Sequence, residues 1–125
     1  MAYTDLGKNK MLDYLGTLAT KIQLYGDEEG GSGTAVPVPK HDESSQLLSV
    51  SWHSAGTEGA DPGHMKMSNS EIDFEVPEGW TVTEAHIKNE AGDETYCITE
   101  LTHETYAEDG IKRVTGITLK LNDPV

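Results

Sequence analysis

A strict two-residue alternation between residues 71 and 76 constrains the fold of this chain more than any other feature. Ile72, Phe74 and Val76 alternate there with acidic residues. Successive side chains of a β-strand point to opposite faces, so the pattern predicts a strand with one apolar face in a core and one acidic face in solvent. Half-buried strands of this kind are typical of antiparallel sheets. The alternation therefore favours a mainly β fold.

The rest of the C-terminal half repeats strands and turns. Runs at residues 81–88, 94–101 and 112–121 are separated by short Gly-, Asn- and Asp-containing sequences that are typical of turns. Each run predicts a further strand. Gly116 and a change of phase after Val114 predict a bulge that bends the last of them.

The N-terminal segment has the spacing of one helix. Asp5 is placed to cap its start, and Gly16 is typical of the residue that follows a helix end. We predict a helix over about residues 5–16 and then a strand over about residues 20–25, with its apolar side chains inward. The apolar side chains that recur near helical intervals are Leu6, Met11, Leu12, Leu15 and Leu18.

Two long segments show neither the helical spacing nor the two-residue alternation of apolar side chains. Residues 26–46 hold a Gly-rich acidic stretch followed by two prolines, and residues 54–70 hold three glycines and a proline. Segments so poor in apolar side chains order themselves at a high entropic cost, so we predict flexible loops. A chain of 125 residues has room for one domain. We therefore predict a single domain over residues 1–125, an antiparallel, jelly-roll-like β-sandwich with one N-terminal α-helix.

The charge of the chain excludes several classes of partner. It has 9 Lys and Arg against 22 Asp and Glu, a net charge of −13 with His neutral. Binding to nucleic acid or to anionic lipid depends on basic side chains, so we predict neither partner. No stretch approaches the roughly 18 apolar residues that cross a bilayer, the N-terminus has no signal-peptide pattern, and Cys97 is the only cysteine. These features predict synthesis in a reducing cytoplasm.

The sequence offers little for catalysis or metal binding. Glu71, Asp73 and Glu75 share one face of the predicted strand, and paired carboxylates can divide into acid and base. The same arrangement is typical of the solvated face of a strand. The five histidines lack metal-ligand spacing, and no calcium-loop, phosphate-loop or nucleophile-elbow pattern occurs. We predict that the protein is not an enzyme and has no cofactor and no metal.

Three other reactive side chains fall in predicted strands. His86 and His103 are expected to have ring nitrogens satisfied by neighbouring polar groups. Cys97 lies between Tyr96 and Ile98, a position that favours a buried and inert thiol. All three are therefore interpreted as structural residues.

Aromatic residues near chain ends and loops are the candidates for contact with another protein. Tyr3, Trp52 and Trp80 have such positions, and His53 adjoins Trp52. Interfaces are enriched in aromatic anchors, so we predict these four residues as a protein interface. A tryptophan exposed in a cleft would instead favour a receptor- or glycan-binding module.

Three segments of the chain, in their order, resemble a known family. They are LGKNKMLDYL at residues 6–15, VSWHSA at 50–55 and NSEIDFEVPEGWTVTEAHI at 69–87. The order is similar to that in a family of small virion proteins of tailed bacteriophages. Those proteins begin with a Gly-Lys-Asn, leucine-rich helix and later carry an alternating strand and a Val-Pro-x-Gly-x-Thr-Val-Thr hairpin. The chain departs from the pattern after Tyr25, where relatives often have His-Thr-x-Asp-Pro-Gly.

The resemblance implies a structural role on the virus particle. It implies a capsid decoration (cement) protein that binds the major capsid protein on the outer surface of the virion, after synthesis in the cytoplasm of a bacterial host. The alternative is a tail or tail-fibre component, with tail proteins as partners. In either place the chain is expected to act as a homo-oligomer, because repeated weak contacts on a lattice add up to tight binding.

Overall fold

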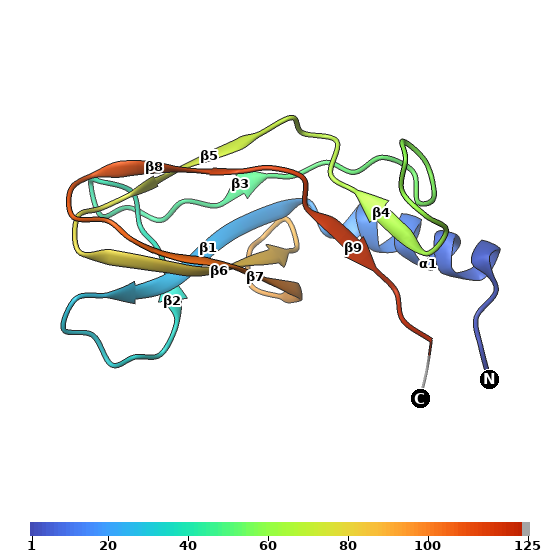
Figure 1. The fold of residues 1–125 in the computed structure, drawn as a ribbon, viewed down its shortest axis with the longest axis horizontal. Helices are drawn as coiled ribbons and strands as arrows, with labels where there is room; N and C mark the ends of the chain where they lie inside the picture. Colours follow the sequence, from blue (N-terminus) through green and yellow to red (C-terminus); the bar gives the residue numbers. More distant parts are fainter. Residues whose placement is uncertain (124–125) are drawn as a thin grey trace.

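Antiparallel strands make up most of the structure, a computed structural model that describes residues 1–123 (Figure 1). Among these residues no helix has both the length and the hydropathy that crossing a membrane requires. The elements are α1 (Asp5–Leu18), β1 (Lys21–Glu28), β2 (Val36–Pro37), β3 (Leu48–Ser49), β4 (His64–Lys66), β5 (Ile72–Val76), β6 (Trp80–Lys88), β7 (Thr95–Thr105), β8 (Gly110–Val114) and β9 (Thr118–Lys120).

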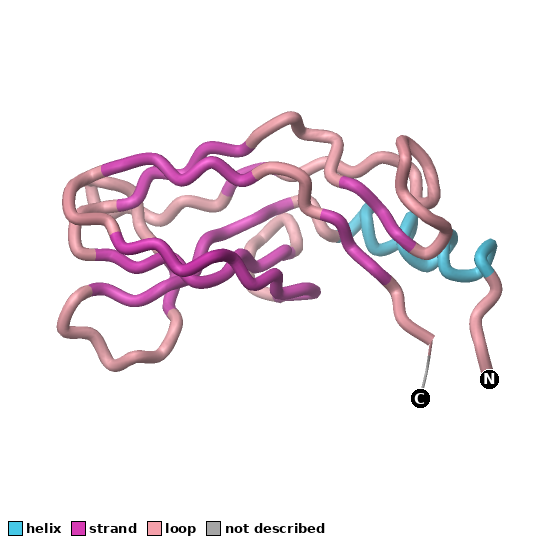
Figure 2. The backbone as a smooth tube through the Cα atoms, in the orientation of Figure 1, coloured by secondary structure: helices cyan, strands magenta, loops and turns pink. Residues whose placement is uncertain are grey.

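The strands form one large sheet and two small ones. The large sheet has the order β2-β1-β6-β7, with β3 also paired to β1, and the small sheets are β4-β9 and β5-β8. All the pairings are antiparallel. Figure 2 shows the β5-β8 pair as a layer over the large sheet, with α1 beside β4-β9 at one end. The prediction of a mainly β, antiparallel structure with one helix is confirmed.

The core lies between the β5-β8 pair and the large sheet. Ile72, Phe74 and Val76 are buried on one face of β5, as the alternation predicts. Ile22 and Leu24 of β1 are fully buried in the same apolar cluster. The period-two pattern thus identified the inward face of both strands, because a sheet residue can point only to one face or the other.

The predicted last strand, residues 112–121, is divided in two. Gly116 has a φ of +65°, a left-handed conformation that L side chains rarely adopt. The chain turns there, so that β8 pairs with β5 whereas β9 pairs with β4. The bend at Gly116 therefore takes the chain from its pairing with β5 to a pairing with β4. It is not a bulge within a single strand.

The ends of α1 differ from their prediction. Thr4, not Asp5, is the N-cap, since its Oγ1 accepts a hydrogen bond of 3.0 Å from the backbone N–H of Gly7. Gly16 lies inside the helix, which continues to Leu18. A Cβ on Gly16 would lie 3.3 Å from Sδ of Met65, so this glycine permits close packing on β4.

The two segments predicted as loops contain strands. Residues 26–46 include the end of β1 and all of β2, and residues 54–70 include β4. Within the first segment the backbone N–H of Val38 donates to the carbonyl of Leu24, at 2.9 Å. The local composition did not show these bonds because each partner lies elsewhere in the chain.

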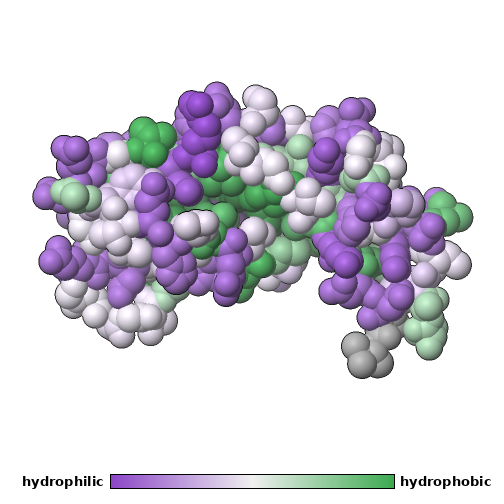
Figure 3. Space-filling view, in the orientation of Figure 1, coloured by the Kyte–Doolittle hydropathy of each residue, from purple (hydrophilic) through white to green (hydrophobic). Residues whose placement is uncertain are grey.

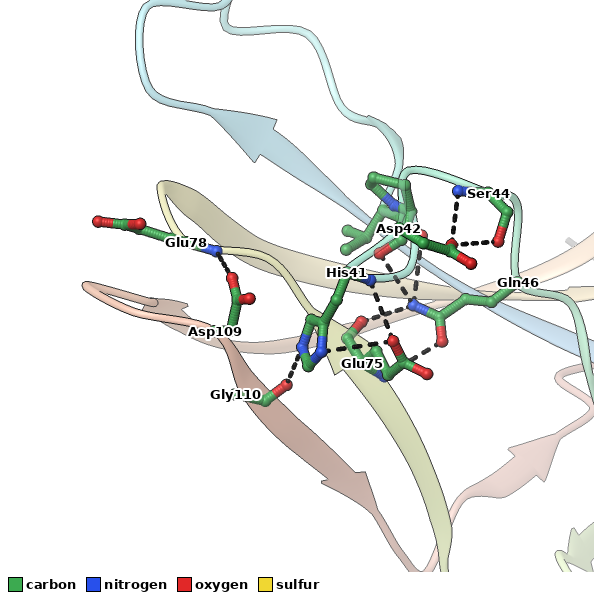
Figure 4. Close-up of polar contacts among 10 residues, drawn as sticks. His41, Asp42, Ser44, Gln46, Glu75, Glu78, Asp109 and Gly110 are labelled. Carbon is green, nitrogen blue, oxygen red and sulfur yellow. Dashed lines mark hydrogen bonds and ion pairs between the residues drawn. The ribbon is translucent and has the colours of Figure 1, made fainter.

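Residues 38–46 are held against β5 by a buried amide (Figure 4). Gln46 is 3% exposed, and its Oε1 accepts the backbone N–H of Glu75 at 3.1 Å while its Nε2 donates to the carbonyl of the same residue. The backbone N–H of His41 donates to the Glu75 carboxylate at 3.0 Å, and His41 Nε2 lies 2.9 Å from the carbonyl of Gly110. The Gln46 side chain thus makes the two bonds that a neighbouring strand would make with β5.

Candidate interaction surface

Trp52 and His53 lie together in a groove between α1 and β4. The groove has a volume of about 420 Å³. The sequence predicts both residues as interface contacts, and the structure brings them to one surface feature. The other residues that line the groove are Asp13, Gly16, Thr17, Ser54 and Met65.

The backbone beside β4 sets the positions of both residues. Trp52 forms an isolated antiparallel bridge with Met67, and the N–H of His53 donates to the carbonyl of Lys66 at 2.9 Å. The indole Nε1 of Trp52 donates to the carbonyl of Ala19 at 2.9 Å. This bond satisfies a carbonyl just beyond the end of α1 and holds the indole ring in one orientation.

The helix forms the other wall of the groove. Asp13 contributes a carboxylate oxygen that accepts the backbone N–H of Ala55 at 2.7 Å. This contact and the close approach at Gly16 tie α1 to the segment that carries Trp52 and His53. The groove is therefore part of a packed interface between elements distant in the sequence.

One face of α1 remains exposed. Of the apolar side chains at helical intervals, Leu12 is buried and Leu15 packs against the core. Leu6, Met11 and Leu18 are exposed. The buried side of α1 carries Leu12 and packs against β4, the Trp52 segment and Gly63, whose N–H donates to Asn9 at 2.8 Å.

Tyr14 adds an aromatic ring to this exposed helix face. Its side chain is 67% exposed. Leu18 also borders a shallow hollow that is lined by Ala91 of the β6-β7 turn and by Tyr96 of β7. Apolar surface thus extends from α1 toward β7.

The structure places Trp80 and Tyr3 away from the groove. Trp80 begins β6, is 8% exposed and belongs to the core cluster, so its ring has little surface to offer a partner.

The N–H of Tyr3 donates to Asp123 at 3.3 Å. Lys8 lies 3.1 Å from the same carboxylate, and its hydrogen bond lowers the pKa of Asp123. Tyr3 and Lys8 therefore tie the N-terminal part of the chain to Asp123.

The acidic face of β5 is engaged in ion pairs. Arg113 lies directly opposite Asp73 in the β5-β8 register and donates to both of its oxygens, at 2.9 and 3.2 Å. This hydrogen bonding lowers the pKa of Asp73. Arg113 also lies 2.8 Å from Glu71. These carboxylates share a cation on an open strand face and do not converge on a pocket.

The reactive side chains of the central strands have structural partners. The ring of His86 stacks on Tyr25 with centroids 3.5 Å apart, and its nitrogens lie 3.2 Å from Glu84 and 3.4 Å from Thr95. Burial raises the pKa of the half-buried Cys97 thiol, which makes the thiolate less accessible. The contacts of His86 agree with its predicted role. Cys97 is half-buried, whereas a buried thiol is predicted, and His103 is exposed.

The stacked position of His86 predicts a pH effect on stability. Burial is the main cause that lowers its pKa from the ordinary 6.5, against the opposing hydrogen bond with Glu84. The unfolded chain therefore binds a proton at this site before the folded chain does, so stability is lost as the pH falls through the unfolded value. We expect the free energy of unfolding to fall more steeply between about pH 7.5 and 5.5 in the wild type than in His86→Gln. Urea titrations across this range measure both slopes, and equal slopes would contradict the assignment.

An acidic groove that no sequence pattern predicts lies at the end of β1. Asp27, Glu28 and Glu29 at the end of β1 meet Glu78 of the β5-β6 turn around a groove of about 660 Å³. Tyr106 also lines it, and burial together with its bond to a neighbouring glutamate raises its pKa to about 12. In the described part of the chain no group of three or more His, Cys, Asp or Glu is placed to hold a metal. Only the tertiary fold brings Glu78 beside β1.

Comparisons of the chain with known protein families, with curated proteins and with solved structures find no match. The function is therefore inferred from the residues and surfaces of the chain itself.

Proposed function

We propose that this protein is a structural virion protein that binds the outside of a bacteriophage capsid as a decoration (cement) protein and stabilises the mature head. The partner is the major capsid protein, and the chain acts there as a homo-oligomer. The finer architecture that we propose is a jelly-roll-like β-sandwich, with the β5-β8 pair and the large sheet as its layers.

The observation that carries this proposal is the apolar surface that α1 leaves exposed. Met11, Tyr14 and Leu18 are exposed on a chain whose net charge is −13. Contiguous apolar surface on an otherwise hydrophilic protein marks a site of contact with another protein. On a capsid the same small patch meets an identical partner at every lattice position, so modest single contacts are sufficient.

The resemblance of the three ordered segments supports the same role. The leucine-rich segment forms α1, and the VSWHSA segment supplies Trp52 and His53 to the groove. Two of the three segments therefore meet at the Trp52 groove, whereas residues 69–87 contain β5 and most of β6. The ion pairs of Glu71 and Asp73 with Arg113 give these acids a structural role that fits a non-catalytic protein.

Co-sedimentation with virus particles tests the proposal. The purified protein is mixed with mature heads that lack it and, separately, with isolated tails, and the copies bound per particle are counted. We expect saturable binding to heads, with many copies on each. His53→Ala should weaken this binding, because His53 lines the groove, whereas His103→Ala removes an exposed histidine elsewhere and should leave it unchanged.

Two results would contradict the capsid role. Binding of a few copies to tails alone would identify a tail or fibre component. Binding to neither particle would overturn a virion role on these surfaces, provided that circular dichroism shows the protein to be folded.

A further inference from the structure

Strand β7 is the longest in the structure and lies at an edge of the large sheet. Among the described residues its one hydrogen-bonded neighbour is β6. An edge strand presents a row of backbone N–H and C=O groups that can pair with a strand of another chain. Pairing of this kind depends on whether the edge is protected.

The other edges carry protective features. β2 is only two residues long and ends in Pro37, which has no N–H to donate. β8 carries Lys112 and Arg113, and charged side chains discourage pairing. The edge of β5 is covered by the Gln46 amide.

β7 lacks the Lys and Pro residues that protect edges most strongly. Thr95–Thr105 contains no Lys, Arg or Pro, its acidic side chains are Glu100 and Glu104, and Ile98 is 58% exposed. The pairing of β7 with β6 is irregular opposite Val82/Glu84 and opposite Ile87/Lys88. Residues 97–100 between these irregularities form a regular stretch, which is the part of the edge suited to accept another strand.

There is open space beside this stretch. A hollow of about 380 Å³ is lined by residues 99–102 of β7 and by residues 112–118 of the β8-β9 segment, which include the charged Lys112 and Arg113. Figure 3 shows apolar surface in the recess between the two layers. The edge is therefore accessible, and covering it would also remove apolar surface from water.

We propose that β7 pairs with β7 of a second copy of this chain, antiparallel about a two-fold axis that passes through Ile98. Ile98 then lies opposite its own counterpart, and Cys97 lies opposite Thr99 of the second copy. Cys97 and Thr99 pair with the buried Ile87 and Ala85 of β6, so both belong to the inner face. The pairing therefore joins two large sheets with their inner faces on the same side.

Charge and side-chain direction exclude some registers, and the contact between the two Ile98 side chains favours this one. An axis through Glu100 would place two carboxylates directly opposite each other, which destabilises a sheet. An axis between two residues would place inner-face side chains opposite outer-face ones. The axis through Ile98 avoids both defects and pairs two exposed β-branched side chains, a favourable cross-strand combination.

Sedimentation equilibrium over a concentration series tests the dimer. The wild type should show a monomer–dimer equilibrium that shifts toward dimer at high NaCl, because salt screens the repulsion between two chains of charge −13. Ile98→Lys places two ammonium groups opposite each other and should weaken dimerisation at least about tenfold. The matched control is Ile111→Lys on β8, a side chain of similar exposure, 55%, which should dimerise as the wild type does.

A cross-link tests the register. In a Cys97→Ser background, Ile98→Cys should form a disulfide-linked dimer under mild oxidation, because the proposed axis places the two copies of residue 98 opposite each other. Glu100→Cys should not form one, because residue 100 lies opposite Tyr96 in this register. Circular dichroism verifies that each variant is folded. A wild type that stays monomeric at all concentrations, or an Ile98→Lys variant that dimerises normally, would overturn the proposal. Sedimentation needs no virus particle, so a monomeric wild type would contradict the dimer without contradicting the capsid role.

Discussion

Phe74→Ala is expected to lower the free energy of unfolding by about 3–5 kcal/mol, the usual cost of removing a buried aromatic ring from a core. Phe74 is fully buried at the centre of β5. Its ring fills space between the β5-β8 pair and the large sheet, where no other phenylalanine exists to replace it. Because small domains are stable by only about 5–15 kcal/mol, this loss is a large fraction of the total.

Urea denaturation at constant pH measures the effect. Phe74→Leu keeps most of the apolar volume and should cost clearly less than Phe74→Ala. Ile111→Ala is a surface control on the strand paired with β5, since Ile111 is 55% exposed. If Phe74→Ala cost less than about 1 kcal/mol, well below the range for core truncations, Phe74 would not hold the two layers together.

Gln46→Leu is expected to destabilise the fold by about 2–4 kcal/mol, since each buried backbone group left unsatisfied costs about 1–3 kcal/mol. The substitution retains a side chain of similar size. It removes the acceptor for the N–H of Glu75 and the donor to the carbonyls of Glu75 and Pro39. The loss should be larger than for an exposed polar residue, because these groups are part-buried and water replaces the amide less readily there.

Thermal and urea unfolding of Gln46→Leu and Ser45→Ala give the comparison. Ser45 is exposed and adjoins Gln46, so its replacement should leave stability nearly unchanged. Amide exchange supplies a second readout, in which the N–H of Glu75 should lose protection in Gln46→Leu alone. Equal stability of both variants would show that residues 38–46 are not held by the amide.

Local patterns predicted the elements that depend on near neighbours. The alternation at Ile72, Phe74 and Val76 identified β5 and its buried face, because side-chain direction along a strand follows from the backbone alone. The prediction of α1 was correct in place, but its end at Gly16 was wrong. Gly16 serves a contact with Met65, which no local rule contains.

The candidate surface was only partly predictable. The sequence predicts Trp52 as an aromatic contact near a loop and His53 as its neighbour. The structure places both residues in one groove. The same reasoning selected Trp80, which is buried in the core. A sequence shows that an aromatic side chain is available, but burial depends on which elements pack over it.

The amino-acid sequence was sufficient to predict an acidic, mainly β chain with one N-terminal helix. These properties follow from composition and from the two periods of side-chain direction, which act over a few residues. The tertiary structure alone decided which edges are covered, as Gln46 covers β5 while β7 remains open. It also decided which apolar side chains of α1 stay exposed. Both depend on contacts between residues far apart in the chain, whose pairing no local pattern specifies.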